Sequence, residues 1–146
     1  MTATPRPVRI GVVGCGLMGR ELAVVCGRWP QLVGHPASPR IVAVADPNPA
    51  ARDWFRSVST VETFAEDWRE LVDRSDLDVL YLAVPHNLHE ELYIAAAQAG
   101  RDYLGEKPFG IDLGADRPVV DADPRPRAPD GVPEPAEDEE GDDRTD

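Results

Sequence analysis

The chain has 146 residues, enough for one ordinary domain and too few for two full ones. Its formal net charge of −12 argues against nucleic-acid binding, because an acidic surface repels the phosphate backbone. The two cysteines, Cys15 and Cys26, give neither a disulfide framework nor a zinc spacing, and no apolar run approaches the length of a membrane span. We therefore expect a cytoplasmic protein with no metal site and no nucleic-acid or membrane partner.

The acidic charge is concentrated at the carboxyl end of the chain. Residues 116–146 contain twelve acidic residues and four arginines, which together contribute −8. The same residues include many prolines and very few apolar side chains, a composition typical of disordered segments. We therefore predict two parts, a folded domain over residues 1–115 and a proline-rich acidic tail over residues 116–146.

The first predicted element is a buried strand that turns on glycines into a helix. A largely apolar run over residues 8–13 precedes Gly14, Gly16 and Gly19, which form a G-x-G-x-x-G pattern, and a helical pattern starts near Leu17. Gly14 permits the tight turn, Gly16 leaves room for a pyrophosphate, and Gly19 lets the helix lie close to the strand. The pattern indicates a dinucleotide site; the alternative is a glycine-rich turn that binds nothing.

Strands and helices then alternate along the chain. We expect further strands over residues 41–46, 60–62, 79–84 and 101–104. We expect helices from an N-cap at Asn48 to about Arg56, from a capping box at Thr63 and Glu66, and from a cap formed by Asn87 and Glu90 to Gly100. This alternation predicts an α/β fold with a doubly wound parallel sheet, in which ligands bind at the carboxyl ends of the strands.

Several polar or special residues fall at these strand ends. They are Gly14, Asp46, Pro85, His86 and Lys107. The convergence of five positions that are distant in sequence supports a binding site at this edge of the sheet. Lys107 is also the only lysine in the chain, which suggests a chemical need for an amine at that position.

The chain resembles the Gfo/Idh/MocA family, the glucose-fructose oxidoreductases and inositol dehydrogenases, from about residue 8 to residue 113. The resemblance is carried by the glycine turn, by residues 45–47, by the Pro-x-x-x-His pattern of residues 85–89, and by Glu106-Lys107-Pro108. It implies a Rossmann-type domain that holds NAD or NADP, followed by a second domain that covers the nicotinamide. The implied substrate is a sugar, a polyol or a related alcohol.

The resemblance also implies roles for individual residues. On the phosphate and ribose side, the cofactor-binding residues would be Gly14, Gly16, Leu17, Met18, Gly19 and Asp46. Asp46 would accept hydrogen bonds from the adenosine ribose and repel a 2′-phosphate, which favours NAD. NADP remains the alternative, since Arg52 could weaken that preference.

The nicotinamide side would be formed by later segments of the chain. Its cofactor-binding residues would be Pro85, His86, His89, Glu106 and Lys107. His89 has a structural alternative, because a residue at a helix start can bond only to nearby backbone. Lys107 would be the catalytic residue that polarises the substrate hydroxyl or relays its proton, provided that its pKa is lowered; the alternative is a surface lysine after a strand.

The resemblance ends near residue 113, so we expect a chain truncated before the second domain, with either a true acidic tail or a frameshifted one. Two functions stay open. The chain is an NAD(P)-dependent oxidoreductase represented by its nucleotide-binding domain, or it is a non-catalytic dinucleotide-binding module or a truncated remnant that lacks the substrate domain. Apolar surface left uncovered by the second domain would favour self-association.

Overall fold

The computed structural model describes residues 5–31, 36–107, 122 and 124. The predicted domain boundary at residue 115, nearly all of the acidic tail and Pro108 lie outside these residues. Within the described part of the chain, no helix is long and apolar enough to cross a membrane.

Five parallel strands form one sheet in the order β3-β2-β1-β4-β5. Their bounds are β1 Arg6–Val13, β2 Ala37–Ala45, β3 Thr63–Ala65, β4 Val79–Leu82 and β5 Tyr103–Gly105. The sheet grows outward from β1 in both directions, so the strand order reverses between β1 and β4. This confirms the predicted Rossmann-type α/β fold and places its switch point, where such folds bind ligands, at the carboxyl ends of β1 and β4.

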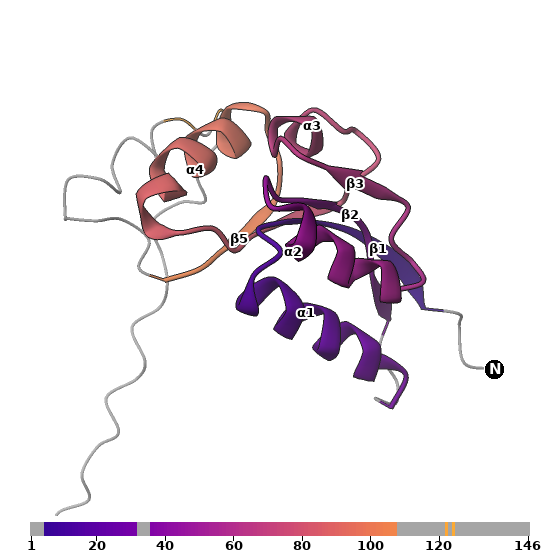
Figure 1. The fold of residues 1–146 in the computed structure, drawn as a ribbon. Coiled ribbons are helices and arrows are strands. Elements are labelled where there is room, and N and C mark those ends of the chain that lie inside the picture. Colours follow the sequence, from indigo (N-terminus) through magenta and orange to yellow (C-terminus); the bar gives the residue numbers. More distant parts are fainter. Residues whose placement is uncertain (1–4, 32–35, 108–121, 123, 125–146) are drawn as a thin grey trace, which may run out of the picture.

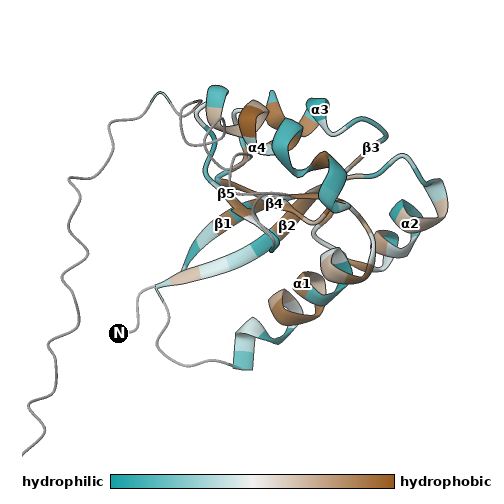
Figure 2. Cartoon of the chain, turned by 90° about the vertical axis from the view of Figure 1, so that its left-hand side faces the viewer, coloured by the Kyte–Doolittle hydropathy of each residue, from teal (hydrophilic) through white to brown (hydrophobic). Residues whose placement is uncertain are grey.

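Helices cover both faces of the sheet. They are α1 Leu17–Arg28, α2 Pro49–Trp54, α3 Arg69–Val72 and α4 His89–Gln98, with 3₁₀ turns at Trp29–Gln31, Phe55–Ser57 and His86–Leu88. Figure 1 shows α1 and α2 on one face and α3 and α4 on the other. In Figure 2 the apolar residues gather on the strands at the centre of the sheet, and α1 carries apolar residues along much of its length.

Two apolar clusters, one on each face, hold these layers together. The cluster on the α1–α2 face contains Val12, Ile41 and Phe55, and the cluster on the α3–α4 face contains Leu80 and Leu92. All five residues of β2 from 41 to 45 are buried. This explains why the sequence of that strand is continuously apolar, as expected of a central parallel strand covered on both faces.

Three local predictions are wrong in detail. The third strand is at Thr63–Ala65 and not at residues 60–62, because its backbone pairs in register with β2 from Ala43 to Ala45. This pairing removes the predicted cap at Thr63, and α3 begins later without a side-chain cap. The predicted cap at Asn87 is absent as well, because residues 86–88 form a 3₁₀ turn before α4.

The cap at Asn48 is confirmed, since its side-chain oxygen accepts a hydrogen bond from the N–H of Ala50 at 3.0 Å. Only some of the apolar side chains of α1 are buried. Ala23 lies in the core, whereas Val24 and Val25 are exposed. Ala23 and Gly19 lie one turn apart, so the buried face of α1 is a line of small residues that brings the helix close to the sheet.

Two glycines of α1 provide a matched test of this close approach. A Cβ at Gly19 would collide with the carbonyl oxygen of Gly14, whereas a Cβ at Gly27 would meet nothing within 4 Å. We expect Gly19→Ala to lower the free energy of unfolding by about 1–3 kcal/mol through overpacking. Gly27→Ala should leave it unchanged or raise it by about 0.5–1 kcal/mol through helix propensity. Urea denaturation of both variants measures the difference, and equal effects would contradict the predicted packing.

Candidate functional site

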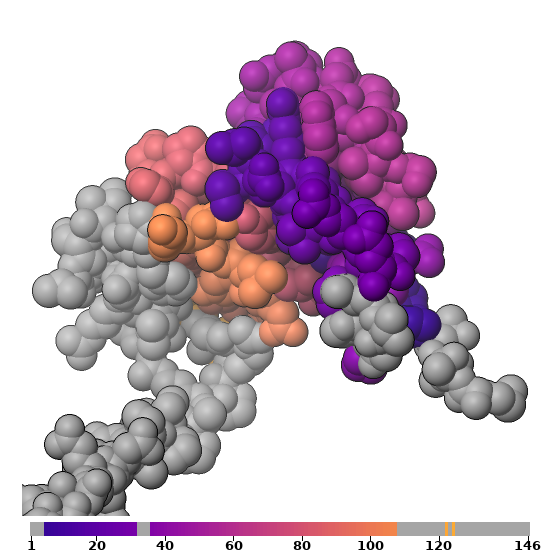
Figure 3. Space-filling view, turned by 90° about the horizontal axis from the view of Figure 1, so that it is seen from below, coloured from indigo at the N-terminus to yellow at the C-terminus, as the bar shows by residue number. Residues whose placement is uncertain are grey.

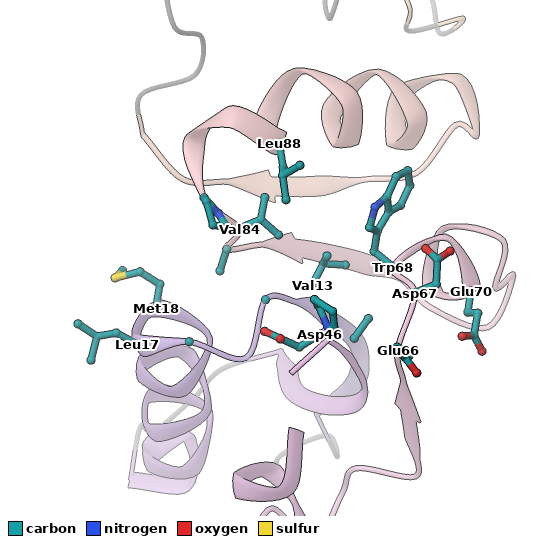
Figure 4. Close-up of a pocket in the computed structure, with 16 residues that line it drawn as sticks. Val13, Leu17, Met18, Asp46, Glu66, Asp67, Trp68, Glu70, Val84 and Leu88 are labelled. Carbon is teal, nitrogen blue, oxygen red and sulfur yellow. The ribbon is translucent and has the colours of Figure 1, made fainter. Parts of the chain in front are cut away.

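A cleft of about 1040 Å³ opens at the carboxyl ends of the central strands. Figure 4 shows Leu17 and Met18 at one end of it, Asp46 and Val13 in the middle, and the acidic residues that follow β3 at the other end. Of the predicted site residues, the cleft is lined by Gly14, Gly16, Leu17, Met18, Asp46 and Pro85. Three of the segments predicted to meet at this edge of the sheet, those that carry Gly14, Asp46 and Pro85, therefore line a single cleft.

The three glycines of the turn have different surroundings. Gly14 has a φ of +98°, and a Cβ there would collide with the carbonyl oxygen of Ala83 at the end of β4. Gly19 packs beneath the turn against Gly14. A Cβ at Gly16, in contrast, would meet nothing within 4 Å. Two glycines thus allow close packing within the protein, whereas the third leaves open space on the cleft side.

The start of α1 is suited to an anion. Gly16 is its N-cap residue, no side chain caps the helix, and its first turn contains no acidic residue. The free N–H groups and the positive end of the helix dipole are the features by which helix N-termini bind phosphate. They lie beside the open space at Gly16.

Asp46 connects two turns at the centre of the cleft. One carboxylate oxygen accepts a hydrogen bond from the N–H of Cys15, and the other from the N–H of Asn48, both at 2.8 Å. The guanidinium of Arg52 donates to the backbone oxygen of Asp46. Because each carboxylate oxygen can accept two hydrogen bonds, Asp46 keeps capacity for ligand hydroxyls while its orientation is fixed.

The thiol of Cys15 lies below the glycine turn and is fully buried. Burial, together with the negative charge of Asp46, raises the pKa of this thiol from its ordinary value of 9.0 to about 12. Cys15 therefore stays protonated at neutral pH and adds no negative charge beside the helix N-terminus.

The predicted residues of the nicotinamide side are less closely grouped. Pro85 lines the cleft, and His86 is exposed just outside it. His89 is buried, and its Nε2 donates to the backbone oxygen of Val84 at 3.0 Å, while Nδ1 lies 3.3 Å from the hydroxyl of Tyr93. These contacts match the structural alternative for His89, and a cofactor contact by this residue stays a prediction.

Glu106 and Lys107 follow β5 at the edge of the sheet, and neither belongs to the lining of the cleft. Lys107 is exposed. Glu106 is half-buried, and its carboxylate accepts a hydrogen bond from the hydroxyl of Tyr81. The catalytic role of Lys107 remains a prediction.

The sequence analysis missed the wall at the far end of the cleft. This wall is formed by Glu66, Asp67, Trp68 and Glu70, which follow β3. The backbone N–H and guanidinium of Arg69 lower the pKa of Asp67, so this carboxylate is charged. The rule that strand ends form the site could have found these residues, had β3 been placed correctly. Among the described residues, no group of three or more His, Cys, Asp or Glu side chains is arranged to hold a metal ion.

A parallel sheet, a glycine turn leading into an uncapped helix at the switch point, and a carboxylate at the end of the next strand together define an NAD(P)-binding Rossmann domain. The sequence model of one family, described as "Oxidoreductase family, NAD-binding Rossmann fold", matches residues 8–122. The chain therefore belongs to the Gfo/Idh/MocA oxidoreductase family, as its motifs indicate.

Relatives within the family include two curated dehydrogenases and a solved structure. Levoglucosan dehydrogenase from Pseudarthrobacter phenanthrenivorans is 35% identical over 105 residues, 70% of this chain and 26% of the relative. Inositol 2-dehydrogenase 4 from Saccharopolyspora erythraea is 32% identical over 81% of this chain and 33% of the relative. The structure of levoglucosan dehydrogenase in complex with NADH has a TM-score of 0.73 at 30% identity, covering 81% of this chain and 32% of that one. The chain thus spans about a quarter to a third of the length of these relatives.

The raised pKa of Cys15 predicts a loss of stability at alkaline pH. Between pH 9 and pH 12 the thiol ionises in the unfolded chain but stays protonated in the folded one, so the folded state becomes less stable as pH rises. From pH 8 to pH 10.5 this group should cost about 2 kcal/mol of unfolding free energy. Cys15→Ala should remove that part of the loss, measured by urea denaturation at both pH values.

The matched control is Cys26→Ala. Cys26 is a half-buried thiol on α1 whose pKa is also raised by burial. The Cys26→Ala substitution should remove less of the loss of unfolding free energy at alkaline pH than Cys15→Ala does. A Cys15→Ala protein that loses as much stability as the wild type over this pH range would contradict the prediction.

Proposed function

We propose that this chain forms the NAD-binding part of an oxidoreductase that acts on a hydroxyl-bearing carbon of a sugar, polyol or related alcohol. The observation that carries the proposal is the open space at Gly16, beside the uncapped start of α1 and inside the cleft. NAD, when bound, supplies the acceptor or donor of a hydride. The chain's own residues bind and orient NAD and transfer the proton of the substrate hydroxyl.

In this proposal the backbone N–H groups of the glycine turn and of Leu17 and Met18 bind the pyrophosphate. Asp46 accepts hydrogen bonds from the adenosine ribose, with its carboxylate held in place by Cys15 and Asn48. The adenosine half then extends toward Trp68 and the acidic wall, and the nicotinamide half extends toward Pro85 and the segment that carries Lys107.

The charges around the cleft support NAD over NADP. A 2′-phosphate would meet the carboxylate of Asp46 and the acidic wall of Glu66, Asp67 and Glu70. Arg52, the residue that could have offset this repulsion, donates to the backbone oxygen of Asp46. Like charges brought together in a site cost several kcal/mol, so the acidic cleft disfavours a 2′-phosphate.

Lys107 is proposed as the group that polarises the substrate hydroxyl or relays its proton, with His86, His89 and Glu106 near the nicotinamide side. The substrate class rests on the relatives, whose names describe dehydrogenases of levoglucosan and inositol. The two free thiols fit the reducing conditions of the cytoplasm. The exposed apolar side chains of α1 and of Leu104 support self-association.

Dinucleotide binding without turnover is the second candidate function. It is favoured by the apolar character of one end of the cleft, where the described lining consists of Leu17, Met18, Val84, Pro85 and Leu88. A proton-transferring group is required for alcohol oxidation. Reduction of NAD by the purified chain with a panel of polyols separates the two candidates, because only the first predicts turnover.

Gly16→Val tests the cofactor site without disturbing the fold. The backbone of Gly16 is extended, with φ −74° and ψ −157°, and a side chain there would point into open space. We expect the melting temperature to fall by only about 4–8 °C, because valine is a poorer N-cap than glycine. The affinity for NADH, measured by titration calorimetry, should fall at least about tenfold. Gly27→Ala is the control, with wild-type affinity. A Gly16→Val protein that binds NADH like the wild type would rule out the pyrophosphate site.

The acidic cleft predicts discrimination between the two cofactors. We expect NADH to bind at least about tenfold more tightly than NADPH in the same calorimetric experiment. Asp46→Asn keeps an acceptor oxygen and removes the charge, so it should bring the affinities for NADH and NADPH closer together. Asp53→Asn removes an exposed carboxylate paired with Arg56 outside the cleft and should leave the ratio unchanged. Equal affinities in the wild type would count against an NAD preference.

A further inference from the structure

Glu106 is held from both faces of the sheet. The hydroxyl of Tyr81 donates a hydrogen bond to the carboxylate of Glu106, and the hydroxyl of Tyr93 donates one to its backbone oxygen at 2.9 Å. Tyr81 belongs to the apolar cluster on the α1–α2 face, and Tyr93 to the cluster on the α3–α4 face. The two tyrosines therefore form a clamp on the residue immediately before Lys107; we call this pair the tyrosine clamp.

Tyr93 is firmly supported in its position. Its side chain is fully buried on α4, and its ring stacks on that of Tyr103 with centroids 5.5 Å apart. Its hydroxyl lies 3.3 Å from Nδ1 of His89, whose Nε2 donates to the end of β4 at Val84. Burial of the side chain and stacking of its ring thus hold the hydroxyl that bonds to Glu106.

Gly105 makes room for this contact. A Cβ at Gly105 would lie 2.5 Å from the hydroxyl oxygen of Tyr93. Any larger residue would force the two apart and break the bond to Glu106. The absence of a side chain here also makes the backbone between β5 and Lys107 intrinsically flexible.

The pairing of β5 with β4 ends at Gly105, one residue before Glu106. β5 has only three residues, it is the edge strand next to β4, and Leu104 within it is 58% exposed. Figure 3 shows the orange segment around β5 reaching the surface of the molecule. The tyrosine clamp acts where the strand ends, on the last half-buried side chain before the exposed Lys107.

The backbone oxygen of Glu106 and the nitrogen of Lys107 belong to one planar peptide group. Fixing the oxygen therefore fixes the orientation of the plane from which Lys107 projects. The carboxylate bond to Tyr81 holds the other side of the same residue. Burial and the neighbouring Glu106 carboxylate raise the pKa of Tyr81, so its hydroxyl keeps the proton that it donates.

We propose that Tyr81 and Tyr93 are positioning residues that set the backbone orientation of Lys107 by clamping Glu106 from both faces of the sheet. The importance of this position rests on the proposed function, in which Lys107 handles the proton of the substrate. The clamp itself is a property of the folded chain and can be measured without substrate or cofactor.

Lys107 is the only lysine, so labelling the full chain with ¹⁵N-lysine gives a single backbone amide signal in the NMR spectrum. We expect the order parameter of this amide to be near 0.85 in the wild type, typical of rigid backbone, and below about 0.6 in Tyr93→Phe and in the double variant with Tyr81→Phe. Glu106→Gln, which keeps an oxygen acceptor for Tyr81, should retain the order.

Two further variants control for general loosening of the fold. Ile41→Val is a conservative substitution in the buried part of β2, on a strand that does not contact β5, and should leave the Lys107 signal unchanged. Gly105→Ala keeps both hydroxyls but displaces Tyr93 from Glu106, and should loosen Lys107 as Tyr93→Phe does. Circular dichroism verifies that each variant is folded.

The outcomes separate the clamp from the proposed function. Folded Tyr93→Phe and Gly105→Ala proteins with wild-type order at Lys107 would overturn the clamp, and so would an equal loss of order in Ile41→Val. NADH titration of the same samples tests the proposed function independently. A wild-type chain that fails to bind NADH would refute that function but would leave the measured order of Lys107, and the clamp, as found.

Discussion

The close contact between the β1–α1 turn and the end of β4 is the constraint on which the rest of the site depends. Gly14 reaches Ala83 only because it has no side chain and adopts a positive φ. Gly19 then allows α1 to lie directly under the turn. Together they direct the N-terminus of α1 into the cleft and leave the space beside Gly16 open. A single larger side chain at Gly14 would separate the strands at the switch point.

Asp46 turns this backbone geometry into an electrostatic site. Its carboxylate is held by two backbone N–H groups from different turns, so a negative charge is fixed at the centre of the cleft before any ligand arrives. The helix N-terminus on one side favours an anion, whereas the acidic wall on the other disfavours one. The cleft therefore has a polarity along its length, and this polarity is the basis of the proposed preference for NAD over NADP.

The sequence was sufficient for the features that local chemistry dictates. Gly14, Asp46 and Pro85 could be placed at strand ends because apolar runs and breakers mark the ends of buried parallel strands. β3 was misplaced because three-residue strands have almost no periodicity, and its position depends on pairing with β2. Tyr81 looked like an ordinary apolar strand residue. Its bond to Glu106 joins positions 25 residues apart, a contact that no local pattern encodes.

The central claim is that the glycine turn and Asp46 form one dinucleotide site, and NMR shift mapping of the ¹⁵N-labelled chain with NADH tests it most directly. The account predicts that the largest changes at saturation occur at the backbone amides of Gly14, Cys15, Gly16 and Leu17 and around Asp46. The amides of Arg9 and Asp78, which lie toward the amino ends of β1 and β4 and away from the cleft, should be unaffected. Saturable binding that leaves the glycine turn unperturbed, or no shifts at all in a folded chain, would contradict the account.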